Sequence, residues 1–289
     1  MARKHSKNLK IELIILAIFV IIAGYNYYQK MKSAELVDDT VELHIIDVGQ
    51  GDSVLIKTKA GNILIDAGTG ESEEALSHYL YSVGVDSFEY CIFTHPHEDH
   101  IGGADMIMED YDVRNVIISP AVTDTVTFER LIDALERSEA NIIEAVPDSK
   151  YSVGDVEIMI IGPIELEDRD LNNSSVITRV SYGAVRMMFT GDAERKQEDD
   201  VLERYSVFDL DCDFLKMGHH GSSTSSSEDF VFAVSPYLAA ISCGKDNEYG
   251  HPHSEILSLL EREEIEYHRT DLMGDIVYVC DGKTIELKE

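Results

Sequence analysis

The sequence predicts an α/β protein in which two stacked β-sheets carry helices on their outer faces. Two strand-rich halves follow one another along the chain, and each contains helical segments that can cover a sheet. The chain has 289 residues, of which 44% are hydrophobic, so it has enough apolar material for a large core. These observations together indicate a layered globular fold.

The first half begins with short strands. Apolar runs that end in turn sequences such as "GQGD" and "KAGN" are typical of strands. One segment has helical spacing and ends at Gly84, where a glycine favours termination of a helix. The predicted strands cover residues 41–48, 53–58, 62–67 and 89–94, and the predicted helix covers residues 72–84.

The second half repeats this style. Runs rich in β-branched and aromatic residues alternate with segments of helical spacing, and no internal linker, repeat or low-complexity tract interrupts them. The predicted strands cover residues 156–162, 175–183, 185–191, 212–217, 236–244, 275–280 and 284–288, and the predicted helices cover residues 193–204 and 253–264.

The N-terminal 40 residues differ from the rest. Residues 11–28 are predicted to be a transmembrane anchor, because an apolar run ends in tyrosines typical of a membrane interface. The basic tail, residues 1–10, predicts a cytoplasmic N-terminus, and a linker of residues 29–40 then leads to an extracellular domain, residues 41–289. The alternatives are a buried helix of the domain and a cleaved signal peptide that leaves a secreted protein, although no A-x-A-like cleavage site follows.

The charge excludes one class of function. Of 24 basic residues six precede Ser33, whereas of 55 acidic residues only Glu12 does, so the remainder holds 18 basic and 54 acidic residues, a formal charge of −36. Such a surface repels polyanions unless metal ions or a local basic patch intervene. The chain as a whole therefore does not resemble a DNA-binding protein, and any phosphate chemistry must be local.

The stretch "FTHPHEDHIGG" follows a predicted buried strand and contains three histidines and two acids within six residues. Imidazoles and carboxylates are the usual ligands of zinc and manganese. Further candidates stand at the ends of two later predicted strands, in "FTGD" and in "LKMGHHGS". The candidate ligands are His95, His97, Asp99, His100, Asp192 and one of the pair His219 and His220.

A single histidine is more often structural than a ligand, and we interpret the isolated histidines in that way. They are His5, His44, His78 and His268. The clustered histidines differ, because side chains two apart on an extended loop point the same way and a turn brings His100 back. One loop can therefore serve two adjacent ions.

The order "LIDAG", "THPHEDHIGG", "FTGD" and "HHGS" resembles the metallo-β-lactamase superfamily, and the likeness covers residues 41–289. "HIIDVGQGDSVLI", "NNSSVITRV", "KMGHHGSSTS" and "NEYGHPH" are similar in particular to the hydrolase domain of ComEC-type competence proteins. The resemblance implies an αββα sandwich that binds divalent metal ions. ComEC proteins have many membrane spans, whereas this chain has one predicted span, so a role in DNA translocation does not transfer.

The resemblance also assigns roles to the candidate residues. His95 and His97 would hold one ion, and Asp99, His100 and His220 a second, with Asp192 bridging the two. Such a pair, zinc or manganese, would activate a water molecule as the nucleophile, which Asp99 could orient as general base.

Further roles concern side chains around these ligands. Asp66 would fix a liganding imidazole, and His219 would face the substrate. His251 would either protonate the leaving oxygen or contact phosphate, or else cap the following helix. Asp47, Gln50 and Asp52 are either near the site or ordinary turn residues.

One departure argues against antibiotic hydrolysis. True lactamases have a further liganding histidine before the bridging acid, but residues 101–218 contain none. The segment "LNNSSV" occupies this region, and its amide and hydroxyl groups suit phosphate oxygens or a hard ion such as manganese. Asn173 and Ser174 are therefore candidate substrate-binding residues, although a polar turn explains the two serines, Ser174 and Ser175, equally well.

The predicted function is that of a binuclear metal-dependent hydrolase, a phosphodiesterase that acts outside the membrane on DNA, a cell-wall polymer or another phosphodiester. The alternative is a catalytically weak accessory or binding protein that uses the same fold. Besides the substrate and the membrane, the sequence indicates no protein partner.

Overall fold

The computed structural model describes residues 39–166 and 170–288. The predicted tail, the predicted anchor and most of the predicted linker lie outside these residues, so the anchor stays a prediction. Within the described part of the chain, no helix is both long enough and apolar enough to cross a membrane.

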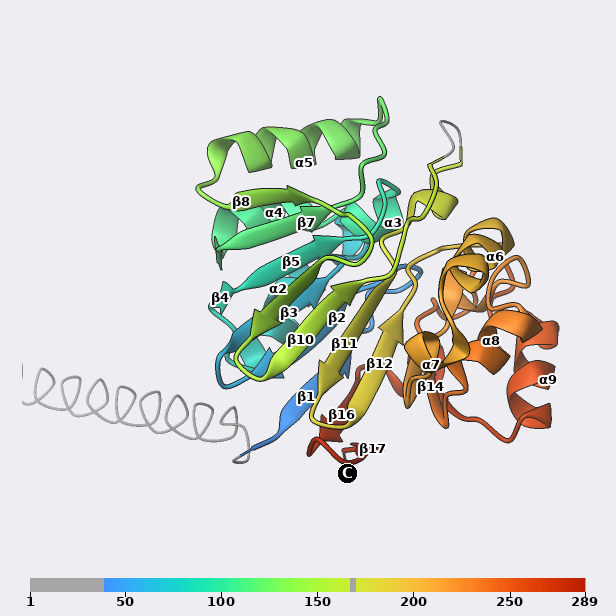
Figure 1. The fold of residues 1–289 in the computed structure, drawn as a ribbon. Helices are drawn as coiled ribbons and strands as arrows, with labels where there is room; N and C mark the ends of the chain where they lie inside the picture. Colours follow the sequence, from blue (N-terminus) through green and yellow to red (C-terminus); the bar gives the residue numbers. More distant parts are fainter. Residues whose placement is uncertain (1–38, 167–169, 289) are drawn as a thin grey trace, which may run out of the picture.

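Two sheets stack face to face in the described residues (Figure 1). The first has eight strands, in the order β17 (Ile285–Leu287), β16 (Ile276–Cys280), β1 (Val41–Ile45), β2 (Val54–Thr58), β3 (Gly61–Ile65), β5 (Tyr90–Phe93), β7 (Asn115–Ile118) and β8 (Asn141–Glu144). The second has seven, in the order β15 (Glu266–Arg269), β14 (Leu238–Ile241), β13 (Phe214–Lys216), β12 (Val185–Phe189), β11 (Thr178–Tyr182), β10 (Val156–Ile160) and β9 (Lys150–Val153). A short pair, β4 (Ser87–Phe88) and β6 (Asp112–Val113), forms a separate two-stranded sheet beside β3.

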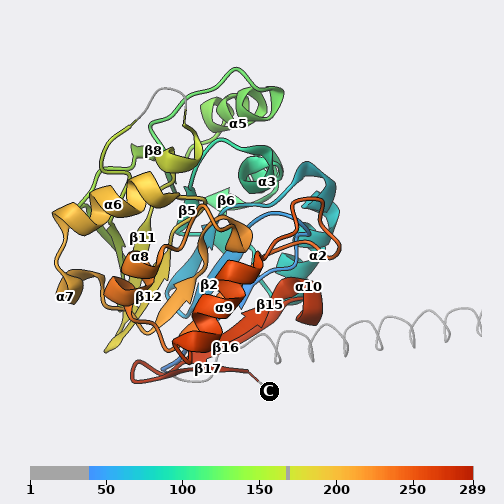
Figure 2. The same ribbon diagram turned by 90° about the vertical axis from the view of Figure 1, so that its right-hand side faces the viewer.

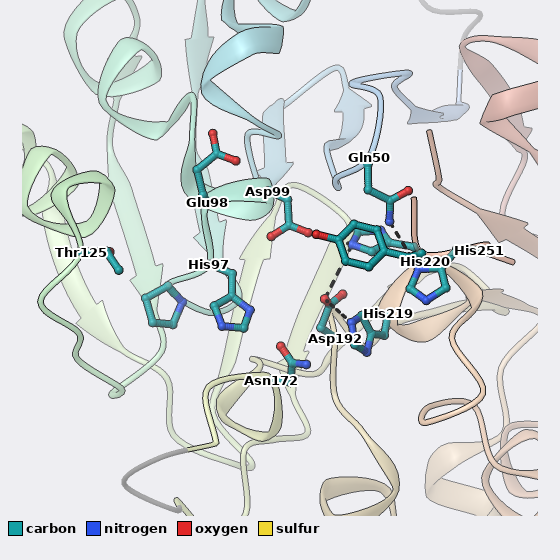
Figure 3. A pocket seen from close by; sticks show the side chains of 12 residues that line it. Gln50, His97, Glu98, Asp99, Thr125, Asn172, Asp192, His219, His220 and His251 are labelled. Atoms are coloured by element: carbon teal, nitrogen blue, oxygen red, sulfur yellow. Dashed lines mark hydrogen bonds and ion pairs between the residues drawn. The ribbon is translucent and has the colours of Figure 1, made fainter. Parts of the chain in front are cut away.

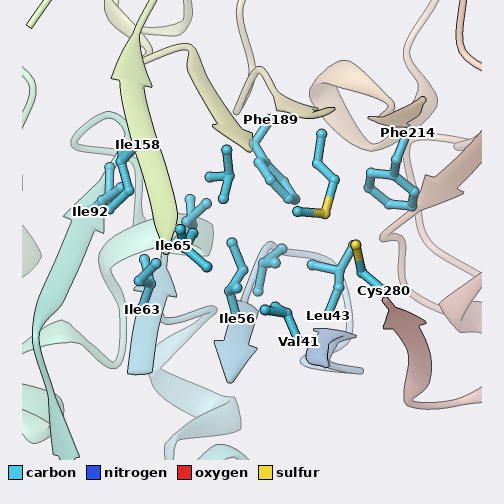
Figure 4. Packing of buried hydrophobic residues seen from close by; sticks show 14 of the residues in the cluster. Val41, Leu43, Ile56, Ile63, Ile65, Ile92, Ile158, Phe189, Phe214 and Cys280 are labelled. Carbon is cyan, nitrogen blue, oxygen red and sulfur yellow. The ribbon is translucent and has the colours of Figure 1, made fainter. Parts of the chain in front are cut away.

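Alternation along the strands builds the core between the sheets. In β2, Ile56 points into the space between the sheets, whereas Leu55 points to the outer face. Figure 4 shows residues of the first sheet such as Ile56 and Leu43 opposite Phe189 and Phe214 of the second. This apolar layer fixes the two sheets against each other.

Helices cover both outer faces (Figure 2). Residues of α2 (Glu73–Ser82), α4 (Ala104–Asp110) and α5 (Val126–Arg137) pack on the first sheet. The second sheet is covered by α6 (Arg195–Arg204), α7 (Val207–Leu210), α8 (Glu228–Val234) and α9 (Ser254–Arg262). Of two short helices, α3 (Glu98–Ile101) connects β5 to α4, and α10 (Thr270–Met273) connects β15 to β16. The αββα sandwich is therefore confirmed.

Several boundaries differ from the prediction. The predicted strand 175–183 begins only at Thr178, because residues 172–174 form a 3-10 turn (η2, Asn172–Ser174) and the next three residues lead away from it. The strand predicted over 41–48 ends at Ile45. The sequence yields no expectation for residues 104–149, in which α4, β6, β7, α5 and β8 follow one another and β7 and β8 extend the first sheet.

Candidate metal centre

The candidate site lies where strands of both sheets end. Strands β12 and β13 are parallel neighbours, so their carboxyl ends meet at one edge of the second sheet. The end of β5 in the first sheet meets them there, because Val176 N donates to Thr94 O across the gap, at 2.8 Å. Figure 3 shows His97 and Asp99 from the first sheet facing Asp192 and His220 from the second.

Four of the predicted ligands form one tight group. Atoms of Asp99, His100, Asp192 and His220 all lie within 4.8 Å of one another. His100 Nε2 lies 3.2 Å from Asp192 Oδ1, and His220 Nε2 lies 3.1 Å from Asp99 Oδ2 and 3.6 Å from Asp192 Oδ2. Two imidazoles and two carboxylates converging on one point can hold a divalent ion.

His95 and His97 lie next to this group, and the ring centroids of His95 and His100 are 4.2 Å apart. His95 Nε2 is 3.0 Å from His97 Nδ1 and 4.0 Å from Asp192 Oδ2. Burial lowers the pKa of both histidines, and that of His95 falls well below its usual value. Both are therefore neutral at pH 7, which is the form that binds metal. The carboxylate of Asp192 thus lies within reach of both groups of candidate ligands, as a bridging carboxylate must.

The tight group has the properties of a cation site. His100 Nε2 and Asp192 Oδ1 are buried, and neither makes a hydrogen bond of good geometry with any described residue. Burial opposes protonation of His100, but the carboxylates of Asp192, Asp66 and Asp99 outweigh it and hold the pKa of His100 well above its usual value. Buried carboxylates that draw a proton onto an imidazole would also attract a divalent ion, so these residues fit the metal.

Polar groups behind the site orient the two imidazoles of the tight group. Asp66 Oδ2 lies 2.7 Å from His100 Nδ1, and Asp66 is itself fixed by the backbone N–H and the hydroxyl of Thr94. His220 Nδ1 donates to Ser242 O at 3.0 Å. Each contact occupies Nδ1 and leaves Nε2 directed at the group, as in a metal-ligating histidine.

Asp52 and Lys216 form a buried ion pair behind His220. Lys216 is 1% exposed and Asp52 is 3% exposed, and Lys216 Nζ contacts Asp52 Oδ2. Asp52 Oδ1 lies 3.2 Å from His220 Nδ1. Burial opposes ionisation of Asp52, but Lys216 and His220 outweigh it and lower its pKa to about 2. Asp52 is therefore no ordinary turn residue, and the lysine inside the apolar run "CDFLKM" was the signal for a buried partner.

The two neighbouring histidines of "HHGS" separate into different roles. Both have left-handed backbone angles, with φ of 49° for His219 and 55° for His220, an arrangement that is strained for residues other than glycine. Both line the pocket, but His220 is buried and belongs to the tight group, whereas His219 has a side chain 22% exposed and is not in that group. This geometry favours His220 as the ligand and His219 as its substrate-facing neighbour.

His251 lines the same pocket (Figure 3). Gly244 N donates to Gln50 Oε1, which fixes the amide so that Gln50 Nε2 points at His251 Nδ1, at 3.4 Å. An amide nitrogen only donates, so the imidazole proton of His251 lies on Nε2. Burial and the charges of His220 and His219 lower the pKa of His251 to about 4. At pH 7 this residue is suited to donate a hydrogen bond and unsuited to serve as a general acid. The alternative that it caps α9 is wrong, because the residue at that position is His253.

Asn173 and Ser174 do not lie where the sequence placed them. Asn173 Oδ1 accepts from the backbone N–H of Glu194 and of Gln197, and Ser174 Oγ donates to Leu171 O. Asn173 is thus occupied by the start of α6 and Ser174 by its own turn, and neither is among the described residues that line the pocket. The neighbouring residue Asn172 takes the predicted position at the pocket.

Asn172 lines the pocket, and its Oδ1 has no hydrogen-bond partner in the described part of the chain. The sequence does not distinguish two adjacent asparagines, because only the direction of the 3-10 turn decides which one faces the candidate metal ligands.

The isolated histidines that the structure describes lie away from the candidate metal centre. His44 contacts Tyr79, His268 contacts Tyr278 and His78 is exposed, whereas His5 falls outside the described residues.

The sequence matches the model of the metallo-beta-lactamase superfamily over residues 46–245. It is 31% identical to ComE operon protein 3 of Bacillus subtilis over 82% of this chain, and 27% identical to competence protein ComA of Neisseria gonorrhoeae over 90%. The chain spans about a third of the length of these relatives, 33% and 35%.

Solved structures share the fold at low sequence identity. YhfI of Bacillus subtilis, a metallo-beta-lactamase fold protein, has a TM-score of 0.57 at 12% identity and covers 83% of this chain and 100% of its own. CmlA of Streptomyces venezuelae, a diiron beta-hydroxylase, has a TM-score of 0.53 at 15% identity, covering 81% of this chain and 53% of its own. Because that protein is a hydroxylase, the fold alone does not fix the reaction. The family model, which matches most of the domain, together with the ligand groups at the sheet edge, shows that this chain belongs to the metallo-beta-lactamase superfamily.

Proposed function

We propose that this protein is a phosphodiesterase that uses two divalent ions, zinc or manganese, and acts on nucleic acid or another phosphodiester polymer. The observation that carries the proposal is that one carboxylate, Asp192, reaches both groups of candidate ligands, with its oxygens 3.2 Å from His100 Nε2 and 4.0 Å from His95 Nε2. Paired ions about 4 Å apart recur in hydrolases and nucleases that cleave phosphate esters.

The ligand groups define what the residues would do. His95, His97 and Asp192 would hold one ion, and Asp99, His100, His220 and Asp192 the other. Ions bound there would polarise a phosphoryl oxygen and lower the pKa of a coordinated water. The chain's own contribution is orientation, because the hydrogen bonds behind His100 and His220 fix both rings before substrate arrives.

Other side chains face the pocket and would act on the substrate directly. The Asp99 side chain is 30% exposed and can accept a proton from the attacking water. His251 Nε2 and the ring of His219, both at the pocket wall, can donate hydrogen bonds to phosphate oxygens, so two groups would hold the diester in place. Asn172 Nδ2 already donates to Glu194 Oε1 at 3.3 Å, so Asn172 offers its unpartnered Oδ1, which can accept a hydrogen bond or ligate a hard ion.

The names of the relatives support a polymeric substrate. Two are called competence proteins or products of a com operon, and a third, 29% identical over 84% of this chain, is recombination protein 2 of Haemophilus influenzae. These names favour a nucleic-acid substrate. The absence of a histidine in residues 101–218 argues against lactam hydrolysis.

Metal analysis and a generic diester test the proposal together. Purified protein should bind close to two divalent ions and hydrolyse bis-p-nitrophenyl phosphate, and a chelator should abolish turnover. Activity that persists in metal-free protein would contradict the mechanism. Two bound ions without turnover of any diester would contradict the phosphodiesterase and indicate the binding protein instead.

We also propose that residues 11–28 anchor the protein in the membrane with the hydrolase domain outside. The basic residues before this segment support the orientation. Protease added to intact cells should then digest the domain, and the apolar segment should remain attached in membrane fractions. Full protection of the domain would overturn the orientation, and release of a shortened soluble chain would favour a cleaved signal.

A further inference from the structure

The pocket over the metal centre offers little positive charge to a polyanion. Its volume is about 560 Å³. The acidic residues Glu98, Asp99 and Asp192 line it, and none of the described lining residues is a lysine or an arginine. Two bound ions would neutralise one phosphate, but a second phosphate inside this pocket would meet no lysine or arginine. Within the pocket, affinity for a longer substrate must therefore come from interactions other than ion pairs with these two residue types.

Tyr249 is an aromatic side chain at this pocket and is 68% exposed. Its ring packs on that of His251, with centroids 5.6 Å apart and an angle of 22° between the planes. This nearly parallel stack supports Tyr249 on one side and leaves most of the ring in solvent. An exposed aromatic ring beside a catalytic pocket can bind a planar group by stacking.

The loop that carries Tyr249 is held by its own hydrogen bonds. Asn247 Nδ2 donates to Gly244 O at 2.8 Å and to His251 O at 2.7 Å, and Asn247 Oδ1 accepts from His251 N at 2.9 Å. His253 Nε2 lies 3.2 Å from Tyr249 O. The ring therefore has a defined place before substrate binds, which reduces the entropy lost on binding.

We propose that Tyr249 is a stacking platform for a nucleobase next to the scissile phosphate, so that the preferred substrate is a single-stranded nucleic acid. This inference rests on the proposed phosphodiesterase function and narrows its substrate class. A base in a duplex is already stacked on its neighbours, whereas a base in a single strand presents its face to the ring. Every base has such a face, so the platform tolerates any sequence.

The test compares two hexanucleotides that have the same sugars and phosphates. One is hexathymidylate, and the other lacks all bases. Hydrolysis-resistant phosphorothioate versions give the dissociation constant by calorimetry on metal-loaded protein, and ordinary phosphodiester versions give KM and kcat. The variants are Tyr249→Ala, Tyr249→Phe and, as a matched control, Tyr81→Ala. Tyr81 is 63% exposed on α2 and is not among the residues that line the pocket.

Wild-type protein should bind the hexathymidylate more tightly than the abasic strand. Tyr249→Ala should weaken binding of the hexathymidylate by roughly 5- to 150-fold, the effect of losing one stacked base, and raise its KM similarly. Binding of the abasic strand should change less than about twofold. Tyr249→Phe and Tyr81→Ala should both behave as wild type, because the ring at the pocket remains.

Three results would overturn the inference. Equal binding of both strands by wild type shows that no base is recognised. An equal loss for both strands in Tyr249→Ala shows that the ring contacts sugar instead. A loss in Tyr249→Phe as large as in Tyr249→Ala shows that the hydroxyl is the binding group.

The binding measurement also separates this inference from the proposed function. If binding depends on the bases but no strand is hydrolysed, the proposed phosphodiesterase function is wrong and the stacking role of Tyr249 stands. If hydrolysis depends neither on the bases nor on Tyr249, the stacking role is wrong and the phosphodiesterase function stands.

Discussion

Replacing Lys216 by methionine should destabilise the protein strongly, although the residue touches no substrate. The change keeps the length of the side chain and removes the cation that pairs with Asp52 in a region where both residues are almost fully buried. Asp52 would then be a buried carboxylate that keeps His220, 3.2 Å away, and His100 as neighbours but has lost its lysine partner. Removing one partner of a buried ion pair costs about 3–5 kcal/mol.

This loss can be measured on metal-free protein, so that metal affinity does not enter. In urea unfolding, the free energy of unfolding of Lys216→Met should be about 3–5 kcal/mol lower than that of wild type. The melting temperature should fall by roughly 6–20 °C. The matched variant Asp52→Asn removes the other charge. In the double variant the losses should not add, and the coupling energy should exceed about 1 kcal/mol. A single-variant loss below about 1 kcal/mol, or purely additive losses, would refute the ion pair as a stabilising element of the site.

Three further predictions concern the bridge, the packing and the response to pH. Asp192→Asn should reduce turnover by roughly 10²-fold or more, because it removes a charge between the two ion positions, whereas His268→Ala should stay within a few-fold in the same diester assay. Gly102→Ala should lower the melting temperature, since a Cβ there would lie 2.2 Å from the backbone nitrogen of Gly70; an unchanged melting curve would contradict this close contact. The pKa of Glu42 is lowered to about 2 by His44, against the effect of burial and with help from Lys288, so its ionised form stabilises the protein above pH 4.5. The difference in unfolding free energy between wild type and Glu42→Gln should therefore shrink as the pH falls from 4.5 to 2, and a constant difference would count against this pairing.

The sequence predicted the layers and the position of the candidate ligands for a physical reason. Metal ligands follow buried strands, and the apolar runs before His95, Asp192 and His219 mark where those strands end. Because the ends of neighbouring strands share an edge, the linear order of motifs predicted a spatial cluster.

What the sequence could not predict depends on directions of side chains. The choice between Asn172 and Asn173 is decided by a single 3-10 turn, and the pairing of Asp52 with Lys216 joins residues 164 positions apart. Nothing in the sequence distinguishes Tyr249 from the other tyrosines, of which the chain has 14 in all. Only the structure shows that Tyr249 is exposed at the pocket. Strand periodicity carries none of this information.

The two sheets each supply part of the ligand set, and this division has a consequence for how the protein matures. The loop after β5 provides four candidate ligands, and the loops after β12 and β13 provide the remainder, so neither half of the chain alone can assemble the site. An ion would bind the folded form far better than the unfolded chain and would stabilise it by about 2.7 kcal/mol when present at a hundred times its dissociation constant. Bound ions would thus stabilise the association of the two halves of the chain. In metal-depleted cells, newly made protein should therefore be degraded faster.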